Sequence, residues 1–148
     1  MRHVLRSIKP YWVYLILKGK KTVEVGKNIP KAEDWSKYIY IYCSKDLKSF
    51  NRIPKEDREW FKKYLGTVVG RFFCSEIGRA YWTDIDGEDG YLLPCLGDEC
   101  LTYDELLDYG QYADLFLYKI SNLEMFEYSK NLKFFGLEKA PQSWCYIK

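Results

Sequence analysis

The spacing of strand-like segments most constrains the fold of this chain. Residues 37–43 alternate three tyrosines with two isoleucines and a cysteine, which is the period of a β-strand. Further strands are expected at residues 3–8, 22–27, 67–77, 113–126 and 144–147. Most gaps between these runs are too short for a helical crossover. The pattern therefore predicts an α+β fold, a mostly antiparallel and partly closed barrel with short helices packed on it.

Short helices are expected between the strands. Pro10 suits the first turn of an apolar helix that ends before Gly19. Pro54 opens a second helix, which ends before Gly66. Thr102 matches a capping box for a third. The 148 residues suit one domain, 1–148, without internal repeats or linkers.

The charge of the chain is polarised along its length. The net charge is only +2, yet the first third is basic and residues 84–114 are acidic. Such a balance argues against a polyanion wrapped around the whole molecule and allows one basic patch. The aromatic fraction of 18% includes 14 tyrosines, which fit either a core or a surface on which bases stack.

Several kinds of site are not expected. His3 is the only histidine, so we expect neither a structural zinc site nor Ser-His-Asp or Cys-His catalysis. Five cysteines, most of them in apolar runs, suggest reduced thiols in a cytoplasmic protein. No phosphate-binding glycine loop and no membrane-crossing apolar run is present. We therefore expect no cofactor, no metal and no membrane partner.

Lys21 and Glu24 are the first candidate site residues. They lie where the first helix gives way to a strand. Strand alternation places Glu24 and Gly26 on one face and Val23 and Val25 on the other. Lys21 can face Glu24 only if it belongs to the preceding turn. From these residues alone, a surface ion pair is the more economical interpretation.

Glu76 is the second candidate. It ends a run of apolar residues on one strand face, where a carboxylate is costly unless it is paired. If Glu76 shared a cleft with Lys21, each charge would shift the pKa of the other, and partial burial could leave one of them as a base.

The C-terminal residues Gln142, Ser143 and Trp144 are the third candidate. They offer an amide, a hydroxyl and a stacking ring. A core position for Trp144 behind a turn is the main alternative.

Two motifs resemble the ASCH domain family. Residues 7–10 and the following apolar helix lead into Gly19-Lys20-Lys21-Thr22-Val23-Glu24, which matches the family signature Gly-x-Lys-x-x-Glu-x-Arg. The ending Ala-Pro-Gln-Ser-Trp-Cys-Tyr (140–146) is similar to that of small stand-alone prokaryotic and phage members. The resemblance covers nearly the full chain.

The resemblance implies a PUA-like barrel with flanking helices and a cleft beside the first helix. It also implies RNA binding. Some small members are amidohydrolases on acylated cytidine nucleosides, with a lysine, a threonine and a glutamate in the site, and others are reported as ribonucleases. By position these residues fall on Lys21, Glu24 and Glu76, so the threonine is replaced by a glutamate.

The sequence departs from the signature at Gly26, where the family has arginine. A guanidinium there could bind phosphate or brace Glu24, and glycine can do neither. Lys27 is expected to point to the other face of the strand.

Three functions remain open from the sequence. The first is RNA or nucleotide binding, with these ligand-binding residues: Lys9, Trp12, Lys20, Lys27, Gln142, Ser143 and Trp144. The second is a metal-independent hydrolase that uses Lys21, Glu24 and Glu76. The third is a non-catalytic phage or mobile-element protein whose acidic segment 84–114 contacts a protein partner.

Overall fold

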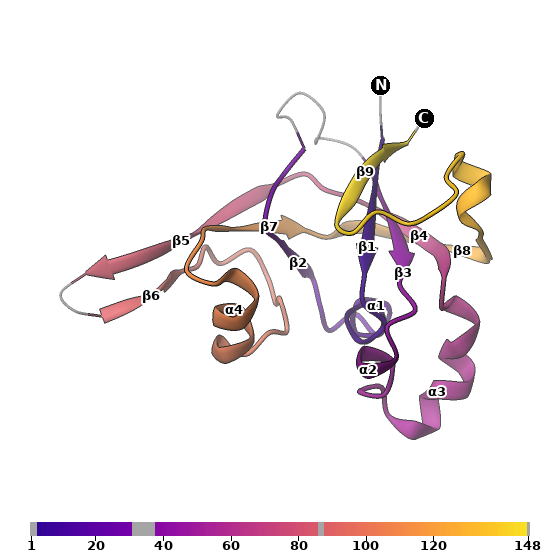
Figure 1. Ribbon diagram of the computed structural model, residues 1–148, viewed down its shortest axis with the longest axis horizontal. Coiled ribbons are helices and arrows are strands. Elements are labelled where there is room, and N and C mark those ends of the chain that lie inside the picture. Colours follow the sequence, from indigo (N-terminus) through magenta and orange to yellow (C-terminus); the bar gives the residue numbers. More distant parts are fainter. Residues whose placement is uncertain (1–2, 31–37, 86–87, 148) are drawn as a thin grey trace.

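A five-stranded sheet forms one half of the fold (Figure 1). The computed structural model describes residues 3–30, 38–85 and 88–147. The strand order in this sheet is β8-β4-β3-β1-β9. Its strands are β1 (His3–Ile8), β3 (Tyr38–Cys43), β4 (Thr67–Phe73), β8 (Ser121–Lys130) and β9 (Trp144–Ile147).

The central strand β1 joins the two ends of the chain. It runs parallel to β3, with Leu5 opposite Tyr40, and antiparallel to β9, with Leu5 opposite Cys145. All other strand pairs in the described residues are antiparallel. The parallel pair is possible because a helix lies between β1 and β3 in the sequence. The C-terminal segment is thereby placed beside the first strand.

A second, four-stranded sheet has the order β2-β7-β5-β6. Its strands are β2 (Val23–Gly26), β7 (Leu115–Lys119), β5 (Ile77–Ile85) and β6 (Glu88–Leu92). In Figure 1 the hairpin of β5 and β6 projects sideways from the body of the molecule. A small apolar cluster packs against this sheet. In it the two valines of β2 contact Leu106, Leu115 and Leu117.

Four short α-helices cover the sheets: α1 (Pro10–Leu17), α2 (Leu47–Phe50), α3 (Lys55–Phe61) and α4 (Tyr103–Gly110). Two 3-10 turns follow α3 and β8, at Lys62–Tyr64 and Leu132–Phe135. The capping box predicted at Thr102 is present, because Thr102 accepts from the Glu105 amide and the Glu105 side chain accepts in return. Val13 and Ile16 of α1 are buried in the largest apolar cluster, together with β1 and β3. This packing fixes the end of α1 against the first sheet.

Two long strands predicted from the sequence are each broken in the structure. The run 67–77 breaks between β4 and β5, and the run 113–126 breaks at Ile120 between β7 and β8. At both breaks the chain passes from one sheet to the other, and the two breaks lie side by side, since the Lys119 amide donates to the Glu76 carbonyl at 3.0 Å. Alternation of side chains cannot reveal such a crossing, because both halves of each run are strands.

The predicted strands at 3–8 and 144–147 are confirmed, and the predicted antiparallel α+β class is confirmed in its coarse form. Within the described residues no strand ladder joins the two sheets, so the partly closed, PUA-like barrel stays a prediction. Helix α2 was not expected from the sequence. Residues 31–37 and 86–87, which include the first residue of the strand predicted at 37–43 and two residues of the acidic segment 84–114, lie outside the described residues.

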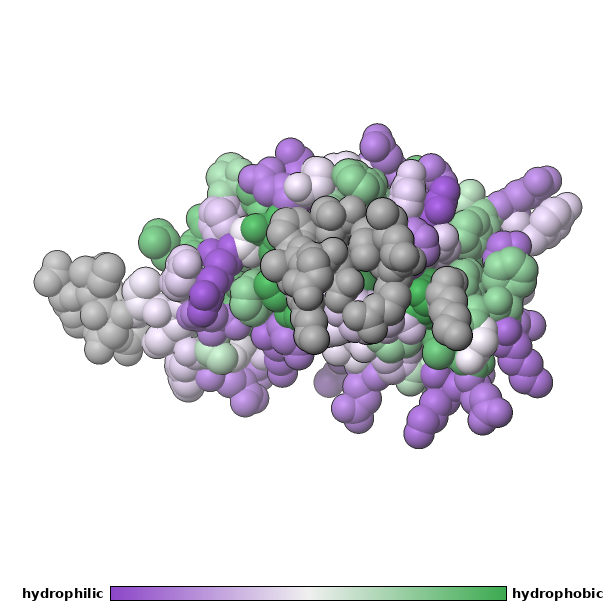
Figure 2. Space-filling model, turned by 90° about the horizontal axis from the view of Figure 1, so that it is seen from above, coloured by the Kyte–Doolittle hydropathy of each residue, from purple (hydrophilic) through white to green (hydrophobic). Residues whose placement is uncertain are grey.

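Hydrophilic side chains dominate the outline of the face that bears the chain ends, with small apolar groups between them (Figure 2). Of the acidic segment, Asp98, Asp104 and Asp108 are exposed. No helix in the described part of the chain combines the length and the apolar character needed to cross a membrane.

Candidate functional site

Lys21 and Glu24 form a buried ion pair at the junction of α1 and β2. The backbone amides of Lys20 and Lys21 both donate to the Leu15 carbonyl, at 3.0 and 3.1 Å, so Lys21 belongs to the turn that ends the helix. Strand β2 begins two residues later. The Lys21 Nζ therefore faces the strand side that bears Glu24 and lies 3.6 Å from its Oε1. The side chain of Lys21 is 0% exposed, so the pair is not the surface contact that the sequence favoured.

The Lys21 ammonium is enclosed from three sides. Its Nζ donates to the Glu99 carbonyl at 2.6 Å and lies 5.3 Å from the centre of the Trp12 ring. Burial lowers the pKa of Lys21, and the Glu24 carboxylate opposes this shift without cancelling it. The Lys21 ammonium is thus held by these contacts, although removing its charge from water costs free energy.

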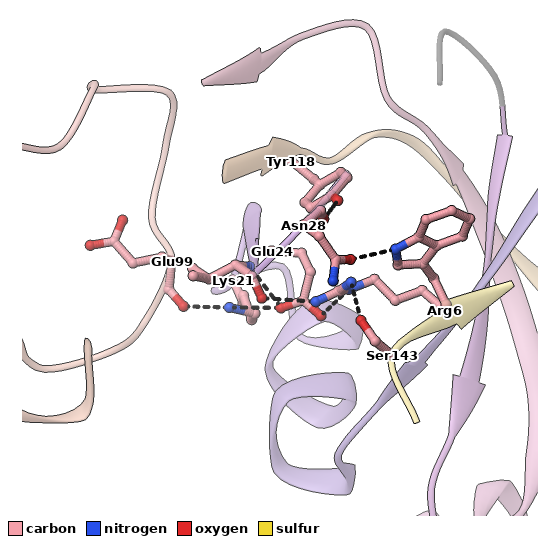
Figure 3. Close-up of polar contacts among 9 residues, drawn as sticks. Arg6, Lys21, Glu24, Asn28, Glu99, Tyr118 and Ser143 are labelled. Atoms are coloured by element: carbon pink, nitrogen blue, oxygen red, sulfur yellow. Dashed lines mark hydrogen bonds and ion pairs between the residues drawn. The ribbon is translucent and has the colours of Figure 1, made fainter. Parts of the chain in front are cut away.

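Arg6 is the second cation on Glu24. Its Nε donates to Glu24 Oε2 at 3.3 Å, and its Nη2 donates to the Val25 carbonyl at 2.9 Å (Figure 3). Glu24 Oε1 also accepts from the Val25 amide at 3.0 Å. Arg6 Nη1 donates to Ser143 Oγ at 3.4 Å. One carboxylate therefore lies between two buried cations, one from the α1–β2 turn and one from β1.

Gly26 provides the space that the Arg6 guanidinium fills. A Cβ at Gly26 would lie 2.9 Å from Arg6 Nη2 and 3.1 Å from Arg6 Nη1. The sequence showed that a glycine at this position cannot itself brace Glu24. The structure shows that β1 supplies a guanidinium to Glu24 across the same space.

A cavity of about 950 Å³ lies over Glu24 and Arg6. Its walls come from β1, the start of α1, the end of β2, helix α4 and the segment that leads into β9. Six cationic side chains line it against two acidic ones, and the cations are Arg6, Lys9, Lys27, Lys45, Lys133 and Lys139. The acids are Glu24, which is paired with Arg6 and Lys21, and Glu138. The cavity therefore combines a cationic rim with a buried polar floor.

Five ligand-binding residues predicted from the sequence line this cavity, namely Lys9, Trp12, Lys27, Gln142 and Ser143. Lys27 was expected to point away, but β2 ends at Gly26 and strand alternation no longer applies there. Its Nζ lies 4.8 Å from the centre of the Tyr109 ring, at the cavity wall.

Lys20, Lys21, Glu76 and Trp144 are not part of the lining. Lys20 is exposed on the turn, and Lys21 lies behind Glu24. Glu76 does not join the pair. Its side chain is 54% exposed in the connection between β4 and β5, where its Oε2 lies 3.9 Å from Lys119 Nζ.

Trp144 packs against the largest core cluster, as the alternative interpretation of the sequence held. Its indole Nε1 donates to Asn28 Oδ1 at 2.6 Å. Asn28 lines the cavity and was missed from the sequence, because nothing around position 28 signals a contact with a residue 116 positions away.

Tyr109 of α4 was also missed. Its ring lines the cavity beside Lys27. Burial raises the pKa of the Tyr109 phenol, and the neighbouring Arg6 opposes the shift. Lys45, Lys133 and Lys139 were missed because they lie in separate segments that only the fold brings together.

Comparison with solved structures relates this geometry to known proteins. No family model and no curated protein sequence matches the chain. The crystal structure of ASCH from Zymomonas mobilis superposes with a TM-score of 0.67 at 18% identity, covering 99% of this chain and 87% of that one. The chain has the ASCH fold.

Crystal structures of two variants of that ASCH protein superpose on the chain equally well. A serine-to-alanine variant gives a TM-score of 0.66 at 17% identity over 99% of this chain and 88% of its own length. A tyrosine-to-phenylalanine variant gives 0.66 at 16% identity over 100% and 91%. The ASCH fold predicted from the two motifs is thus confirmed over almost the entire chain.

Proposed function

We propose that the chain acts as one ASCH-type domain that binds RNA or a nucleotide in the cavity over Glu24 and Arg6. The main support is the distribution of charge, because six cationic side chains converge on one cavity of a chain whose net charge is only +2. Clustered cations on a nearly neutral protein are typical of a site for a short anionic ligand.

The cavity also offers surfaces for bases. Trp12 and Tyr109 lie in its walls, and aromatic rings stack on bases regardless of sequence. Gln142 adds an amide that can pair with a base edge. Lysines at the rim and rings in the walls match the two parts of a nucleotide, its phosphate and its base.

The test is the salt dependence of binding to short single-stranded RNA, measured by fluorescence anisotropy. A triple alanine variant of Lys27, Lys133 and Lys139 removes three lysines of the lining. We expect weaker binding and a smaller slope of log affinity against log salt, by about 0.7 for each lysine that contacts a phosphate.

The matched control is the triple alanine variant of Lys48, Lys55 and Lys63, which are exposed and lie outside the lining. It loses the same net charge and should bind almost as the wild type does. Equal loss in the two variants, or RNA affinity that does not depend on salt, would contradict the proposal.

Hydrolysis in the same cavity is a second candidate, favoured by the Glu24 carboxylate in the cavity lining. Because Lys21 lies behind Glu24, the carboxylate and not the amine is the group that would take a proton from an attacking water. Lys21 and Arg6 would then position Glu24, and Glu76 would take no part.

This candidate is tested by incubating the protein with an acylated cytidine nucleoside and, separately, with the RNA used for binding. Release of the acyl group or cleavage of the RNA should be lost in Glu24→Gln. If the wild type at high concentration turns over neither substrate, the hydrolase proposal fails and the binding proposal stands.

A further inference from the structure

Asn28 accepts two hydrogen bonds, one from the buried Tyr118 and one from the half-buried Trp144. Tyr118 Oη donates to the Asn28 backbone carbonyl at 2.5 Å, and Trp144 Nε1 donates to its side-chain Oδ1 at 2.6 Å. An indole N–H can only donate, so the oxygen of the amide must face Trp144. The amide orientation therefore follows from the chemistry of its partner.

The same bond leaves the amide nitrogen directed elsewhere. In Figure 3 the Asn28 nitrogen points toward the side of the Arg6 guanidinium. Among the described residues, no group accepts a hydrogen bond from this nitrogen, and Asn28 lines the cavity. Asn28 thus presents a donor to the cavity, in a fixed direction.

Neighbouring groups also offer donors. Arg6 donates to Glu24, Val25 and Ser143 and also interacts with the Tyr109 phenol at the cavity wall. Ser143 accepts from Arg6, so its own hydroxyl proton remains available. Since these donors include a guanidinium and the surrounding rim is cationic, they favour an anionic acceptor over a neutral carbonyl.

We propose that Asn28, locked by Trp144, determines the specificity of the cavity by presenting an amide donor that binds a phosphate oxygen together with Arg6 and Ser143. This inference rests on the proposed function, because the phosphate is that of the bound RNA or nucleotide. The phosphate is either the terminal group of a mononucleotide or an internal group of an RNA strand.

The test replaces Asn28 by aspartate. The carboxylate still accepts from the Trp144 indole, but it presents an oxygen instead of a donor to the cavity. We expect phosphate-containing ligands to bind about tenfold more weakly or worse. The probes are uridine 5′-monophosphate, uridine and a six-nucleotide RNA, measured by calorimetry or anisotropy.

Asn131→Asp is the matched control for charge. Asn131 also lines the cavity, and its side-chain oxygen caps the Phe134 amide at 3.0 Å, which a carboxylate can do as well. It adds the same charge to the same cavity without altering the Asn28 donor. We expect a loss of less than about threefold at physiological salt, where exposed charges are screened.

Trp144→Phe tests whether the indole sets the orientation. Without the indole N–H the amide can turn over, so we expect binding to fall about threefold. In an Asn28→Ala background the same change should cause no further loss. A loss that is equal in both backgrounds would show a merely structural role for Trp144 and would overturn the locking.

The outcomes separate the two proposals. Wild-type protein that binds neither the mononucleotide nor the RNA overturns both. Wild-type binding with equal losses for Asn28→Asp and Asn131→Asp overturns only the role of Asn28. If Asn28→Asp loses binding of the mononucleotide, the subsite holds a terminal phosphate. If Asn28→Asp loses binding of the RNA alone, the subsite holds an internal phosphate.

Discussion

The Arg6 guanidinium lies against Gly26, where any larger residue would clash with it. The Arg6 guanidinium fills the volume that a side chain at Gly26 would need, with Nη2 only 2.9 Å from the position of a Cβ. The Tyr118 ring lies 3.0 Å from the same position. The glycine is therefore required by an arginine from a different strand, and the pair places a guanidinium on Glu24 at the cavity floor.

Gly26→Ala should lower the free energy of unfolding by about 1–3 kcal/mol, because the added methyl group overpacks a buried site. Urea denaturation measures the change. In an Arg6→Ala background the cost should fall, since the guanidinium no longer occupies the space. An unchanged cost in that background would place the strain on Tyr118 alone.

Glu24→Gln should be more harmful than Lys21→Met. Removing the carboxylate leaves two buried cations without their shared partner, and breaking a buried pair in this way costs about 3–5 kcal/mol. Removing Lys21 leaves Glu24 paired with Arg6 at 3.3 Å. Chemical denaturation of both variants tests this order, and a larger loss in Lys21→Met would contradict it.

The lowered pKa of Lys21 predicts a dependence of stability on alkaline pH. Burial makes the folded pKa lower than the unfolded one. Between the two values the unfolded state binds more protons, so this group's contribution to stability rises with pH. The free energy of unfolding of the wild type relative to Lys21→Met should therefore increase as pH approaches about 10.4, the unperturbed lysine value. Urea titrations at pH 7 and pH 10 measure the difference, and a decrease would contradict the prediction.

The cysteines should differ in their reactivity toward iodoacetamide. Burial raises the pKa of the Cys43 thiol to about 12 and that of the Cys74 thiol to about 11, whereas Cys95 is exposed. Because the thiolate is the reactive form, Cys43 should react on the order of a thousandfold more slowly than an ordinary thiol at pH 8. Mass spectrometry should find Cys95 alkylated first, with Cys43 and Cys74 protected until urea is added. Early alkylation of Cys43 would contradict the burial.

Local patterns predicted much of the fold. The alternation around Tyr40, the proline and glycine that bound α1, and the capping box at Thr102 all act over a few residues, and the structure contains each of them. The predictions failed where a strand passes between sheets, at residues 74–76 and at Ile120, because that change depends on partners distant in the sequence.

The candidate site likewise has a part that was predicted from local sequence and a part that was not. Lys21 and Glu24 are only three residues apart, so the sequence predicted the turn and the strand that bring them together. It did not predict their burial. Glu76 was assigned by strand order, and the structure places it in solvent beside Lys119.

The sequence by itself determined the α+β class, the ASCH motifs, and the lysine and glutamate of the first helix–strand junction. These depend on periodicity and on short-range stereochemistry. Only the tertiary structure decided that Arg6 contacts Glu24 in the space beside Gly26 and that Trp144 donates to Asn28. Each of these contacts joins residues that are far apart in the chain. They form because β1 pairs with β9 and the end of β2 lies against these two strands.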